Sequence, residues 1–383
     1  MTGRVLWRPL TVLHPAHNNA GSITLHSSDD ARPPGVGMAE KAHPSPQRRL
    51  RRAPAMPAVA NCVLAMVVAA VVGLYAGSAV AADTIRLAVQ KTGTVAWELD
   101  VIRAHGLDKQ ANIRIEPIEL ASPEAGKIAL RGGSADIIVS DWTWVSRERA
   151  LGAHLVFQPY STALGAVMVP AASSINRLED LRARKIAVAG GPIDKSWLLL
   201  QGALKRDGID LAMQATVVYG APTLLAEKTL HGELDATLNY WNICASLEAR
   251  GFRRLVEIAD LLPKLGAKGR PAMIGYVFDE RWAAQHRDLI ARFIEISAKA
   301  KDILATSDAE WQRIAHLVGT VDQATLKVYR DRYREGIPRR SIDDEEADAR
   351  ALYNVLASLG GPALVGGANT LDPGTFYRVR PGG

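Results

Sequence analysis

Short apolar runs rich in β-branched residues alternate with longer stretches of helical spacing along most of the chain after residue 83. Runs of this kind, bounded by turn residues, are typical of buried strands. They predict nine strands, at residues 84–89, 113–118, 136–139, 154–158, 165–169, 185–189, 216–219, 236–239 and 273–278. Since helices are expected between most of them, the pattern predicts an α/β fold with largely parallel sheets.

The pattern becomes mainly helical from Arg281 onward. Apolar residues keep helical spacing over three segments, at residues 289–300, 326–333 and 347–356. Ser341, followed by Asp344 three positions later, is typical of a helix N-terminus, and Gly-Gly-Pro at 360–362 predicts the end of that helix. The acidic run at 343–346 is therefore expected in a first helical turn and not in a metal site.

The first 82 residues have a different composition. Residues 1–57 are rich in Pro, Ala, His and Arg, lack apolar periodicity and are expected to be disordered. Residues 58–82 follow a basic cluster, contain an almost unbroken apolar run and end in small residues. This order predicts a secretory signal peptide, cleaved near Ala81 or Ala82. The alternative is an uncleaved anchor, because the run is nearly long enough to span a bilayer.

Most of the excess positive charge belongs to this leader. The whole chain has 46 Lys or Arg and 40 Asp or Glu, a formal charge of +6. Eight of the basic and three of the acidic residues lie in the first 82 positions, which leaves 38 and 37, a formal charge of +1. No nucleic-acid partner is therefore expected. Cys244 is the only cysteine after residue 82, so that part of the chain forms no internal disulfide.

Two segments a hundred residues apart share one pattern. Residues 85–97 read IRLAVQKTGTVAW and residues 185–197 read KIAVAGGPIDKSW, each with a strand, a glycine turn and a helix start. In an open parallel sheet, ligands bind outside the carboxyl ends of the strands, where free N–H groups at helix N-termini carry partial positive charge. Each segment is therefore a candidate ligand cradle, although the same joint is common in α/β proteins without a ligand there.

Two further joints support the same organisation. Residues 131–136 read RGGSAD and residues 230–236 read LHGELDA, so both halves of the chain have a glycine and then an aspartate where a helix leads into a strand. Ser122 followed by Pro123 predicts another helix start, with Ser122 as its N-cap.

Motifs of common enzyme classes are absent from the sequence. The glycine turn at 189–194 lacks the glycines of a phosphate loop, no G-x-G-x-x-G follows the first predicted strand, and no G-x-S-x-G is present. The histidines after residue 82 show no paired helical spacing for a metal; they are His105, His154, His231, His286 and His316. We therefore expect no metal, no cofactor and no catalytic residue. Only His231 lies near a predicted ligand loop.

The order of five segments resembles a known family. They read IRLAVQKTG, KIALRGGSADIIVSDWTW, GAVMVPAASSINRLEDLRARKIAVAGGPIDKSW, LHGELDATLNYWN and AMIGYVFDERWAAQHRDLIARFIE. Together they resemble the solute-binding proteins of ABC importers, in the branch for nitrate, sulfonates, taurine and thiamine precursors. The resemblance covers residues 83 to about 359.

The resemblance implies a type II periplasmic-binding-protein fold, with two α/β lobes, two hinge crossings and a helical C-terminal region. The first lobe would comprise residues 83–169 and 271–383, and the second residues 170–270. A small organic ligand, sulfonate-, taurine- or pyrimidine-like, would bind between them. A monomeric protein in the periplasm would then deliver it to an inner-membrane ABC permease. The alternatives are an enzyme on the same fold, resembling the pyrimidine-precursor synthases, and an anchored ligand sensor.

Fifteen residues at predicted strand ends and helix starts are candidate ligand contacts. The first lobe contributes Thr92, Gly93, Trp97, Ser122, Ser140, Asp141 and Trp142, and the second Gly191, Asp194, Lys195, Ser196, Tyr219, Asn239, Tyr240 and Trp241. Tryptophans gathered near strand ends favour a ligand with an apolar or flat body, and we expect Trp142 and Trp241 to face each other across the cleft. Asp141 and Asp194 beside the cradles argue against a purely anionic ligand.

Several of these residues have an alternative role in the fold. Asp194 has the position of a helix N-cap. Trp97 equally fits packing of a first helical turn against the sheet, and Lys195 a solvated surface charge. Ser140 and Tyr219 lie at predicted strand ends, where a local hydrogen bond is as good an explanation as a contact with a ligand.

Overall fold

The computed structural model describes residues 82–90 and 93–379. The predicted extension at 1–57, nearly all of the predicted signal peptide at 58–82, and Thr92 therefore lie outside the described residues. Within the described ranges, no helix combines the length and apolar character that a membrane crossing requires.

All nine predicted strands are confirmed within a few residues. They are β1 (Asp83–Gln90), β2 (Ile113–Leu120), β3 (Ile138–Asp141), β4 (Leu155–Ser161), β5 (Gly165–Pro170), β6 (Lys185–Ala189), β7 (Thr216–Gly220), β8 (Ala236–Tyr240) and β10 (Ile274–Asp279). The structure adds β9 (Phe252–Glu257), which the sequence analysis missed. Its sequence FRRLVE contains three charged residues and so lacks the apolar run that indicates a buried strand.

Helices connect most of the strands and dominate the end of the chain. They are α2 (Val95–Ala104), α3 (Leu107–Gln110), α4 (Pro123–Arg131), α5 (Trp142–Ala150), α6 (Lys195–Lys205), α7 (Leu211–Gln214), α8 (Pro222–Leu230), α9 (Trp241–Ala249), α10 (Ile258–Leu261), α11 (Glu280–Gln285), α12 (Arg287–Thr306), α13 (Asp308–Arg313), α14 (Ala315–Val318), α15 (Gln323–Glu335) and α16 (Ile342–Val365), with 3₁₀ turns at Leu178–Leu181 and Pro263–Leu265. Ser341 caps α16 as predicted, since its hydroxyl accepts the N–H of Asp344 at 3.2 Å. The predicted stop is only a break, because the helix is interrupted at Gly361 and then resumes.

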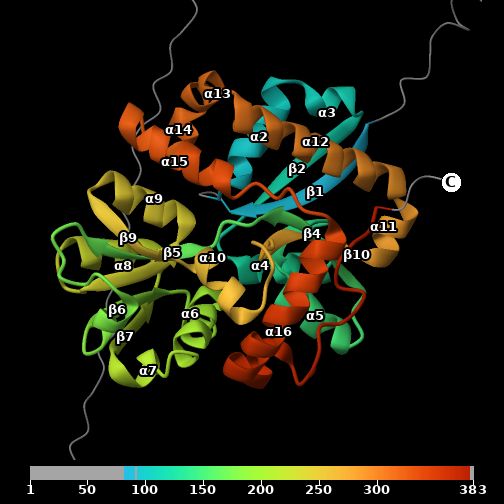
Figure 1. Cartoon of the computed structure of the whole chain (residues 1–383). Helices are drawn as coiled ribbons and strands as arrows, with labels where there is room; N and C mark the ends of the chain where they lie inside the picture. The colour runs from blue at the N-terminus through green and yellow to red at the C-terminus, as the bar shows by residue number, and fades with distance from the viewer. Residues whose placement is uncertain (1–81, 91–92, 380–383) are drawn as a thin grey trace, which may run out of the picture. The chain divides into compact units, whose positions relative to one another are not determined.

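The strands form two groups, which we call the first lobe and the second lobe (Figure 1). In the first lobe β1 pairs in parallel with β2, β10 lies antiparallel between β3 and β4, and a bridge from Leu87 to Ile137 links the two sheets. In the second lobe the strand order is β7-β6-β8-β5-β9, with β6 parallel to β7 and β8, and β5 antiparallel to β8 and β9. The sheets are therefore mixed and not largely parallel. The antiparallel strands β5 and β10 are the ones that follow the crossings between lobes.

The crossings place β5 differently from the sequence-based boundary. Residues 83–169 were expected in the first lobe, but β5 pairs with β8 and β9 of the second. The chain crosses at residues 162–164 and returns at residues 266–273, after α10 has packed against α6. The apolar sequence of β5, GAVMVP, suits a buried strand of either lobe, so the pattern alone did not assign it.

The shared glycine–aspartate joint has the same role in both lobes. The carboxylate of Asp136 accepts the N–H of Arg86 in β1 at 2.8 Å, and that of Asp235 accepts the N–H of Lys185 in β6 at 2.7 Å. In return, the N–H groups of both aspartates donate to the carbonyl groups of the same two residues, at 2.9 Å. Asp136 thereby sets the start of β3 beside β1, and Asp235 sets the start of β8 beside β6, so that the carboxyl ends of each pair meet at one edge.

Helix α16 joins the two lobes a third time. It packs against α6 of the second lobe and α5 of the first. Its Tyr353 lies against Trp142 of α5, and Val355 comes so close to Gly202 of α6 that a Cβ there would lie 2.6 Å from it. Trp142, Trp197 of α6 and Tyr353 belong to one hydrophobic core that includes residues of both lobes. The C-terminal region therefore fixes α5 and α6, the two helices that matter most for the site.

Candidate functional site

A cavity of about 220 Å³ lies where α5 and α6 begin. Asp141 lines it from the first lobe, and Gly191, Asp194, Lys195 and Tyr240 line it from the second. These are five of the fifteen residues named from the sequence. They come together because α5 follows β3, α6 follows β6, and Tyr240 ends β8, so all lie at carboxyl ends of strands. We call this space the Asp141 cavity.

Asp141 caps α5 on the first-lobe side of the cavity. Its Oδ1 accepts the N–H of Trp144 at 2.9 Å and the hydroxyl of Thr143, while its Oδ2 lies 2.9 Å from Nζ of Lys195. Burial alone would raise the pKa of Asp141, but Lys195 and these hydrogen bonds outweigh burial and lower the pKa to about 2. The side chain is therefore an anion at neutral pH.

Lys195 reaches the cavity from the second lobe, at the first position of α6. Burial favours its neutral amine, yet the carboxylates of Asp141 and then Asp194 hold the pKa of Lys195 above its ordinary value. The alternative of a solvated surface charge is wrong, because the side chain is only 26% exposed and paired. The Asp141–Lys195 ion pair is thus a direct charged contact between the lobes.

Asp194 caps α6, as its position in the sequence suggested. Its Oδ1 accepts the N–H of Ser196 at 2.9 Å and that of Trp197 at 3.3 Å. Burial raises the pKa of Asp194, and neither Lys195 nor these N–H groups offset the effect. Within the described residues no Lys or Arg forms an ion pair with this carboxylate, since the Lys195 ammonium is directed to Asp141.

The turn between β6 and α6 requires glycine. Gly190 has φ 89° and Gly191 has φ 150°. A Cβ at Gly190 would lie 2.8 Å from the Tyr240 hydroxyl oxygen and 3.0 Å from Oδ2 of Asp194. Tyr240 therefore closes over the turn with its hydroxyl beside Asp194. Burial and then the Asp194 charge raise the pKa of Tyr240, so the hydroxyl keeps its proton.

The rim of the Asp141 cavity contains residues that the sequence analysis missed. Nζ of Lys127 lies 5.3 Å from the centre of the Trp144 ring and 3.7 Å from a carboxylate oxygen of Glu124. Arg147 donates to the carbonyl of Ala363 in α16 at 3.2 Å. Lys127 and Arg147 lie inside helices, beyond their first turns, and Ala363 lies near the C-terminus. None of them follows a strand, so the search for strand ends did not find them.

Other predicted contacts lie in the protein interior. Five of them do not line either of the two cavities described here and are at most 7% exposed: Trp97, Ser140, Trp142, Ser196 and Asn239. The amide of Asn239 is bonded within the fold, because Nδ2 donates to the Pro222 carbonyl at 2.9 Å and to the Thr237 hydroxyl at 3.4 Å, and Oδ1 accepts the Tyr240 N–H at 2.9 Å. Their positions at strand ends serve the fold.

Of three further predicted residues, two have local roles in the fold, and the contacts explain no role for the third. The hydroxyl of Ser122 caps α4 by accepting the N–H of Ala125 at 3.2 Å, as predicted. Gly93 forms the turn before α2, with its N–H donating to the Gln90 carbonyl at 2.9 Å. Tyr219 is exposed at the end of β7. None of the three lines the Asp141 cavity.

The expected pairing of Trp142 with Trp241 is wrong. Trp142 is fully buried and packs on Tyr353, with ring centres 6.5 Å apart. Trp241 instead meets Trp97 edge-on at 6.0 Å and lies 6.3 Å from Tyr333. Both rings serve packing. A tryptophan at a strand end can either pack in the core or bind a ligand, so its position in the sequence did not distinguish the two roles.

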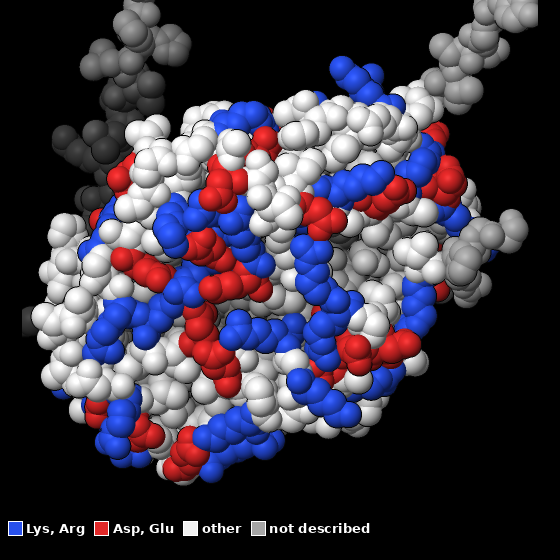
Figure 2. Space-filling model, turned by 45° about the horizontal axis from the view of Figure 1, so that its top comes forward, with Lys and Arg blue, Asp and Glu red and all other residues white. Residues whose placement is uncertain are grey.

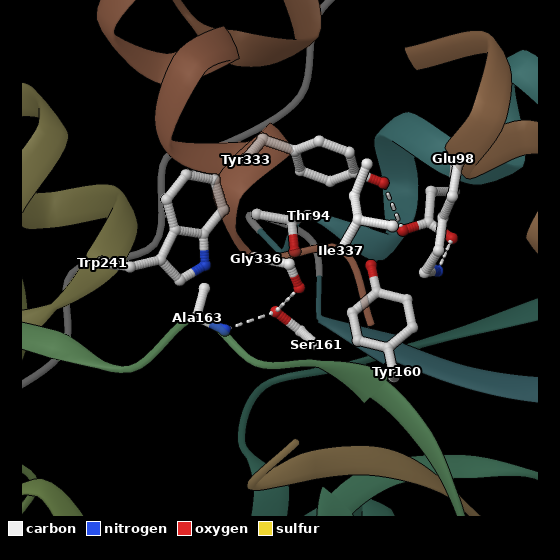
Figure 3. A pocket seen from close by; sticks show the side chains of 10 residues that line it. Thr94, Glu98, Tyr160, Ser161, Ala163, Trp241, Tyr333, Gly336 and Ile337 are labelled. Atoms are coloured by element: carbon white, nitrogen blue, oxygen red, sulfur yellow. Dashed lines mark hydrogen bonds and ion pairs between the residues drawn. The ribbon is translucent and has the colours of Figure 1, made fainter. Parts of the chain in front are cut away.

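A second cavity, of only about 10 Å³, lies beside Trp241 (Figure 3). Glu98 and Lys301 form an ion pair in its wall, and the Tyr333 hydroxyl donates to Glu98 at 2.6 Å. Nζ of Lys301 also lies 3.9 Å from the centre of the Tyr160 ring. This volume holds about one water molecule, so we describe the region as a packed interface, the Trp241 contact.

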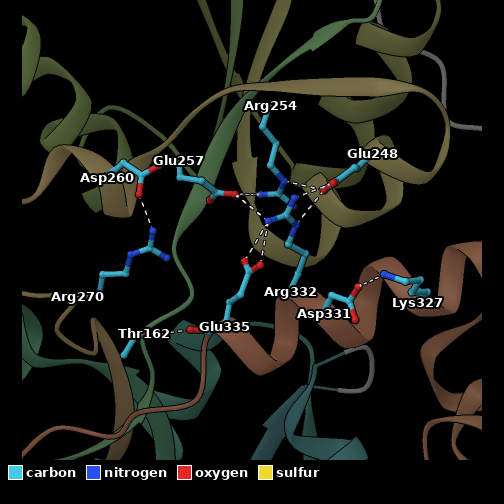
Figure 4. Close-up of polar contacts among 10 residues, drawn as sticks. All are labelled: Thr162, Glu248, Arg254, Glu257, Asp260, Arg270, Lys327, Asp331, Arg332 and Glu335. Atoms are coloured by element: carbon cyan, nitrogen blue, oxygen red, sulfur yellow. Dashed lines mark hydrogen bonds and ion pairs between the residues drawn. The ribbon is translucent and has the colours of Figure 1, made fainter. Parts of the chain in front are cut away.

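A charged network crosses between the lobes near the Trp241 contact (Figure 4). Arg332 of α15 donates to both carboxylate oxygens of Glu248 in α9, at 2.7 and 3.0 Å. Arg254 of β9 donates to Glu248 and to Glu257, each at 2.7 Å. Acidic and basic side chains also alternate over the face in Figure 2. In the described part of the chain, no group of three or more His, Cys, Asp or Glu residues is placed to hold a metal ion.

Solved structures share this architecture. The chain is similar to the alkanesulfonate-binding protein SsuA from Xanthomonas axonopodis pv. citri bound to MOPS, with a TM-score of 0.59 and 19% identity over 76% of this chain and 98% of that one. It is also similar to the aliphatic sulphonate binding protein SsuA from Escherichia coli, with a TM-score of 0.57 and 20% identity over 71% and 91%. An ABC transporter structure from Parabacteroides distasonis has a TM-score of 0.59 and 13% identity over 78% and 99%.

At these identities the likeness establishes the fold, which is the predicted two-lobed type II periplasmic-binding-protein fold with a helical C-terminal region. No curated protein matches the chain. The family model described as NMT1/THI5 like matches residues 101–310, which is more than half of the 383 residues. The chain therefore belongs to the NMT1/THI5 like family.

Proposed function

We propose that this protein is the extracytoplasmic solute-binding component of an ABC importer, and that it holds a small organic solute in the Asp141 cavity. The observation that carries the proposal is the position of this cavity. It lies at the carboxyl ends of strands from both lobes, and charged side chains of both lobes line it. In an α/β fold this is the place where ligands bind.

The ligand class follows from the fold's relatives and from the cavity size. A volume of about 220 Å³ suits a small organic molecule such as a sulfonate-, taurine- or pyrimidine-like solute. The similar proteins from Xanthomonas axonopodis and Escherichia coli are described as binding alkanesulfonates and aliphatic sulphonates. These descriptions support a binding role for the present chain, while the charges of its own cavity decide the solute.

A binding protein fits the site better than an enzyme does. The residues that line the two cavities include no histidine and no cysteine. The Asp141 carboxylate is held ionised by Lys195, and Lys195 is held protonated by Asp141, so neither is free to move a proton near neutral pH. An enzyme resembling the pyrimidine-precursor synthases and an anchored sensor remain the alternative functions.

The cellular setting forms part of the same proposal. A signal peptide at residues 58–82, cleaved near Ala81 or Ala82, would deliver the protein to the periplasm, where an inner-membrane permease would accept the solute. We propose that the protein acts as a monomer, with lobes that meet near the crossings at 162–164 and 266–273. Mass spectrometry of the protein from its native envelope tests the cleavage, since an intact segment at 58–76 contradicts it.

A thermal-shift screen of the purified full-length protein tests the binding function. The solutes are alkanesulfonates, taurine, nitrate, pyrimidines and small amines. A solute at a hundred times its Kd stabilises the folded state by about 2.7 kcal/mol, which gives a clear rise in Tm. The full-length protein with Asp141→Ala is the control, because a true ligand should lose most of its effect there. If no solute raises the Tm of the unaltered protein, the proposed function is wrong.

A further inference from the structure

We infer that the Asp141 cavity selects a solute with a positive charge, such as a protonated amine or amidine, over a simple sulfonate or nitrate ion. This inference rests on the proposed solute-binding function and narrows its ligand class. It differs from the ligands named for the similar sulfonate-binding structures.

Two helix N-termini at the cavity, those of α5 and α6, are already occupied by carboxylates of the chain itself. An anion site at a helix start needs free N–H groups. Asp141 accepts the N–H of Trp144 in α5, and Asp194 accepts those of Ser196 and Trp197 in α6. A sulfonate placed at the start of either helix would meet the negative charge of the aspartate that already accepts these N–H groups. The two helix starts therefore repel an anion.

The basic side chains of the cavity are also already paired. The pairs are Lys195 with Asp141 at 2.9 Å, Arg147 with Glu148 at 3.0 Å, and Lys127 with Glu124 at 3.7 Å. A sulfonate would have to break one of them to gain a cation. Of these three basic side chains only Lys195 forms an ion pair with Asp141. Separating Lys195 from Asp141, whose side chain is 7% exposed, would leave a buried carboxylate without an ion-pair partner. The Lys127–Glu124 pair costs less to open, because the Glu124 side chain is 72% exposed.

Asp194 is the charged lining residue, among those that the structure describes, whose charge is not matched by an ion pair. Its Oδ1 caps α6, whereas Oδ2 faces the Gly190 turn next to the Tyr240 hydroxyl. Burial raises the pKa of Asp194 above its ordinary value, and a positive charge placed beside the carboxylate would favour its ionised form. The lining has three acidic and three basic side chains, but Arg147 is paired with Glu148 outside the lining, and this leaves the Asp194 carboxylate without a paired cation. A monovalent cation would neutralise that charge.

The remaining walls suit the carbon skeleton of such a solute. Tyr240 and Ile193 both line the cavity and are 39% and 43% exposed. Leu364 of α16 contributes a further apolar side chain. A tyrosine face attracts a nearby cation, whereas it does not attract a sulfonate. A small amine with a short alkyl or flat body therefore fits both the charge and the surface of the cavity.

Calorimetry on the purified full-length protein at neutral pH tests the charge preference. The probes are two pairs of similar size: n-butylamine with 1-butanesulfonate, and 4-aminopyridine with benzenesulfonate. We expect the cation of each pair to bind at least about tenfold tighter than the anion. Tighter binding of the sulfonates overturns this inference and leaves the proposed binding function intact. If neither these probes nor any solute of the wider screen binds, both fail.

The variant Asp194→Asn separates charge from helix capping. Asn caps a helix about as well as Asp, so α6 should keep its start while the cavity loses one negative charge. We expect n-butylamine to bind about tenfold or more weakly and 1-butanesulfonate to bind no more weakly than before. The matched control is Asp279→Asn, because Asp279 caps α11 through the N–H groups of Arg281 and Trp282 and does not line the cavity. An equal loss for both probes, or the same loss in the control, overturns the inference.

Discussion

The two lobes meet in two regions that differ in how completely side chains fill them. At the Trp241 contact, aromatic rings and a buried ion pair leave room for about one water molecule, whereas the Asp141 cavity is roughly twentyfold larger. Tyr240 and Trp241 are neighbours at the end of β8, yet Tyr240 lines the cavity and Trp241 fills the contact. The end of β8 therefore contributes to both regions. The difference between the two regions distinguishes residues that hold the lobes together from residues that contact a solute.

The charges of the two regions also differ in their balance. At the Trp241 contact the buried Glu98 meets both Lys301 and the Tyr333 hydroxyl. In the Asp141 cavity, Asp194 accepts two N–H groups and lies beside the Tyr240 hydroxyl; the Lys195 charge acts on it, but no Lys or Arg of the described residues forms an ion pair with it. A satisfied buried pair stabilises one arrangement of the lobes, while an unmatched charge beside an empty space favours a ligand.

The largest effect is expected at the Trp241 contact, from Glu98→Ala. Removal of Glu98 leaves the buried Lys301 ammonium without its carboxylate and the Tyr333 hydroxyl without its acceptor. We expect a loss of about 3 to 5 kcal/mol in the free energy of unfolding, measured by urea denaturation. The double variant Glu98→Leu with Lys301→Met should recover much of this loss. A loss below about 1 kcal/mol for Glu98→Ala would mean that the pair does not hold this contact together.

A smaller effect is expected from pH at the Asp141 cavity. The pKa of Asp141 is lowered in the folded protein to about 2, against about 3.9 for an unfolded chain. Its contribution is therefore fully present above about pH 4 and is lost as the pH falls toward 2, a change of about 2 kcal/mol. Urea denaturation at several pH values should show this loss, and Asp141→Asn should show less acid sensitivity. Equal acid sensitivity of the two proteins contradicts the assignment.

Gly190→Ala sharpens the comparison on the cavity side. The new methyl group would lie 2.8 Å from the Tyr240 hydroxyl, on a backbone with φ 89°. We expect a loss of about 1 to 2 kcal/mol in stability and weaker binding of n-butylamine, because Tyr240 and Asp194 must move. Gly208→Ala is the matched control, since Gly208 has φ 72° but no atom within 4 Å of the added carbon. Unchanged binding in Gly190→Ala would show that Tyr240 does not shape the site.

The smallest effect is expected in the charged network beside the Trp241 contact. Arg332→Ala removes the two hydrogen bonds to Glu248 that join α15 to α9. These groups are partly exposed, so we expect a loss of about 1 kcal/mol that decreases at high salt. Arg339→Ala, which breaks a more exposed pair with Asp302, should cost less. Stability measured at low and at high salt distinguishes the two variants, and a salt-independent loss would contradict an electrostatic role.

The sequence predicted the frame of the molecule well because strands and helix starts depend on local pattern. Nine strands, the caps at Ser122 and Ser341 and the cap at Asp194 follow from apolar runs and capping chemistry. The antiparallel course of β5 and β10 did not follow, because the direction of pairing depends on where the chain crosses between lobes. Strand β9 was missed because its charged side chains join a network with α15, which only the folded chain brings near.

Part of the candidate site was predicted because strand ends can be recognised from the local sequence pattern. Asp141, Gly191, Asp194, Lys195 and Tyr240 stand at strand ends, and the fold brings these ends to one edge. Strand-end position did not separate residues that face the cavity from neighbours that face the core. Asn239 and Trp142 are such neighbours, and both are used for packing. The part of the wall from α16 lies far along the chain, so no local pattern predicted it.

A structure of the protein bound to its tightest solute tests most directly the claim that the Asp141 cavity, and not the Trp241 contact, receives the ligand. We predict that the solute lies between Asp141 and Asp194, with a positively charged group beside Asp194, and that Trp241 keeps its packing on Trp97. A solute bound against Glu98 and Trp241, or an anionic group placed on Lys195 in exchange for Asp141, would contradict the account.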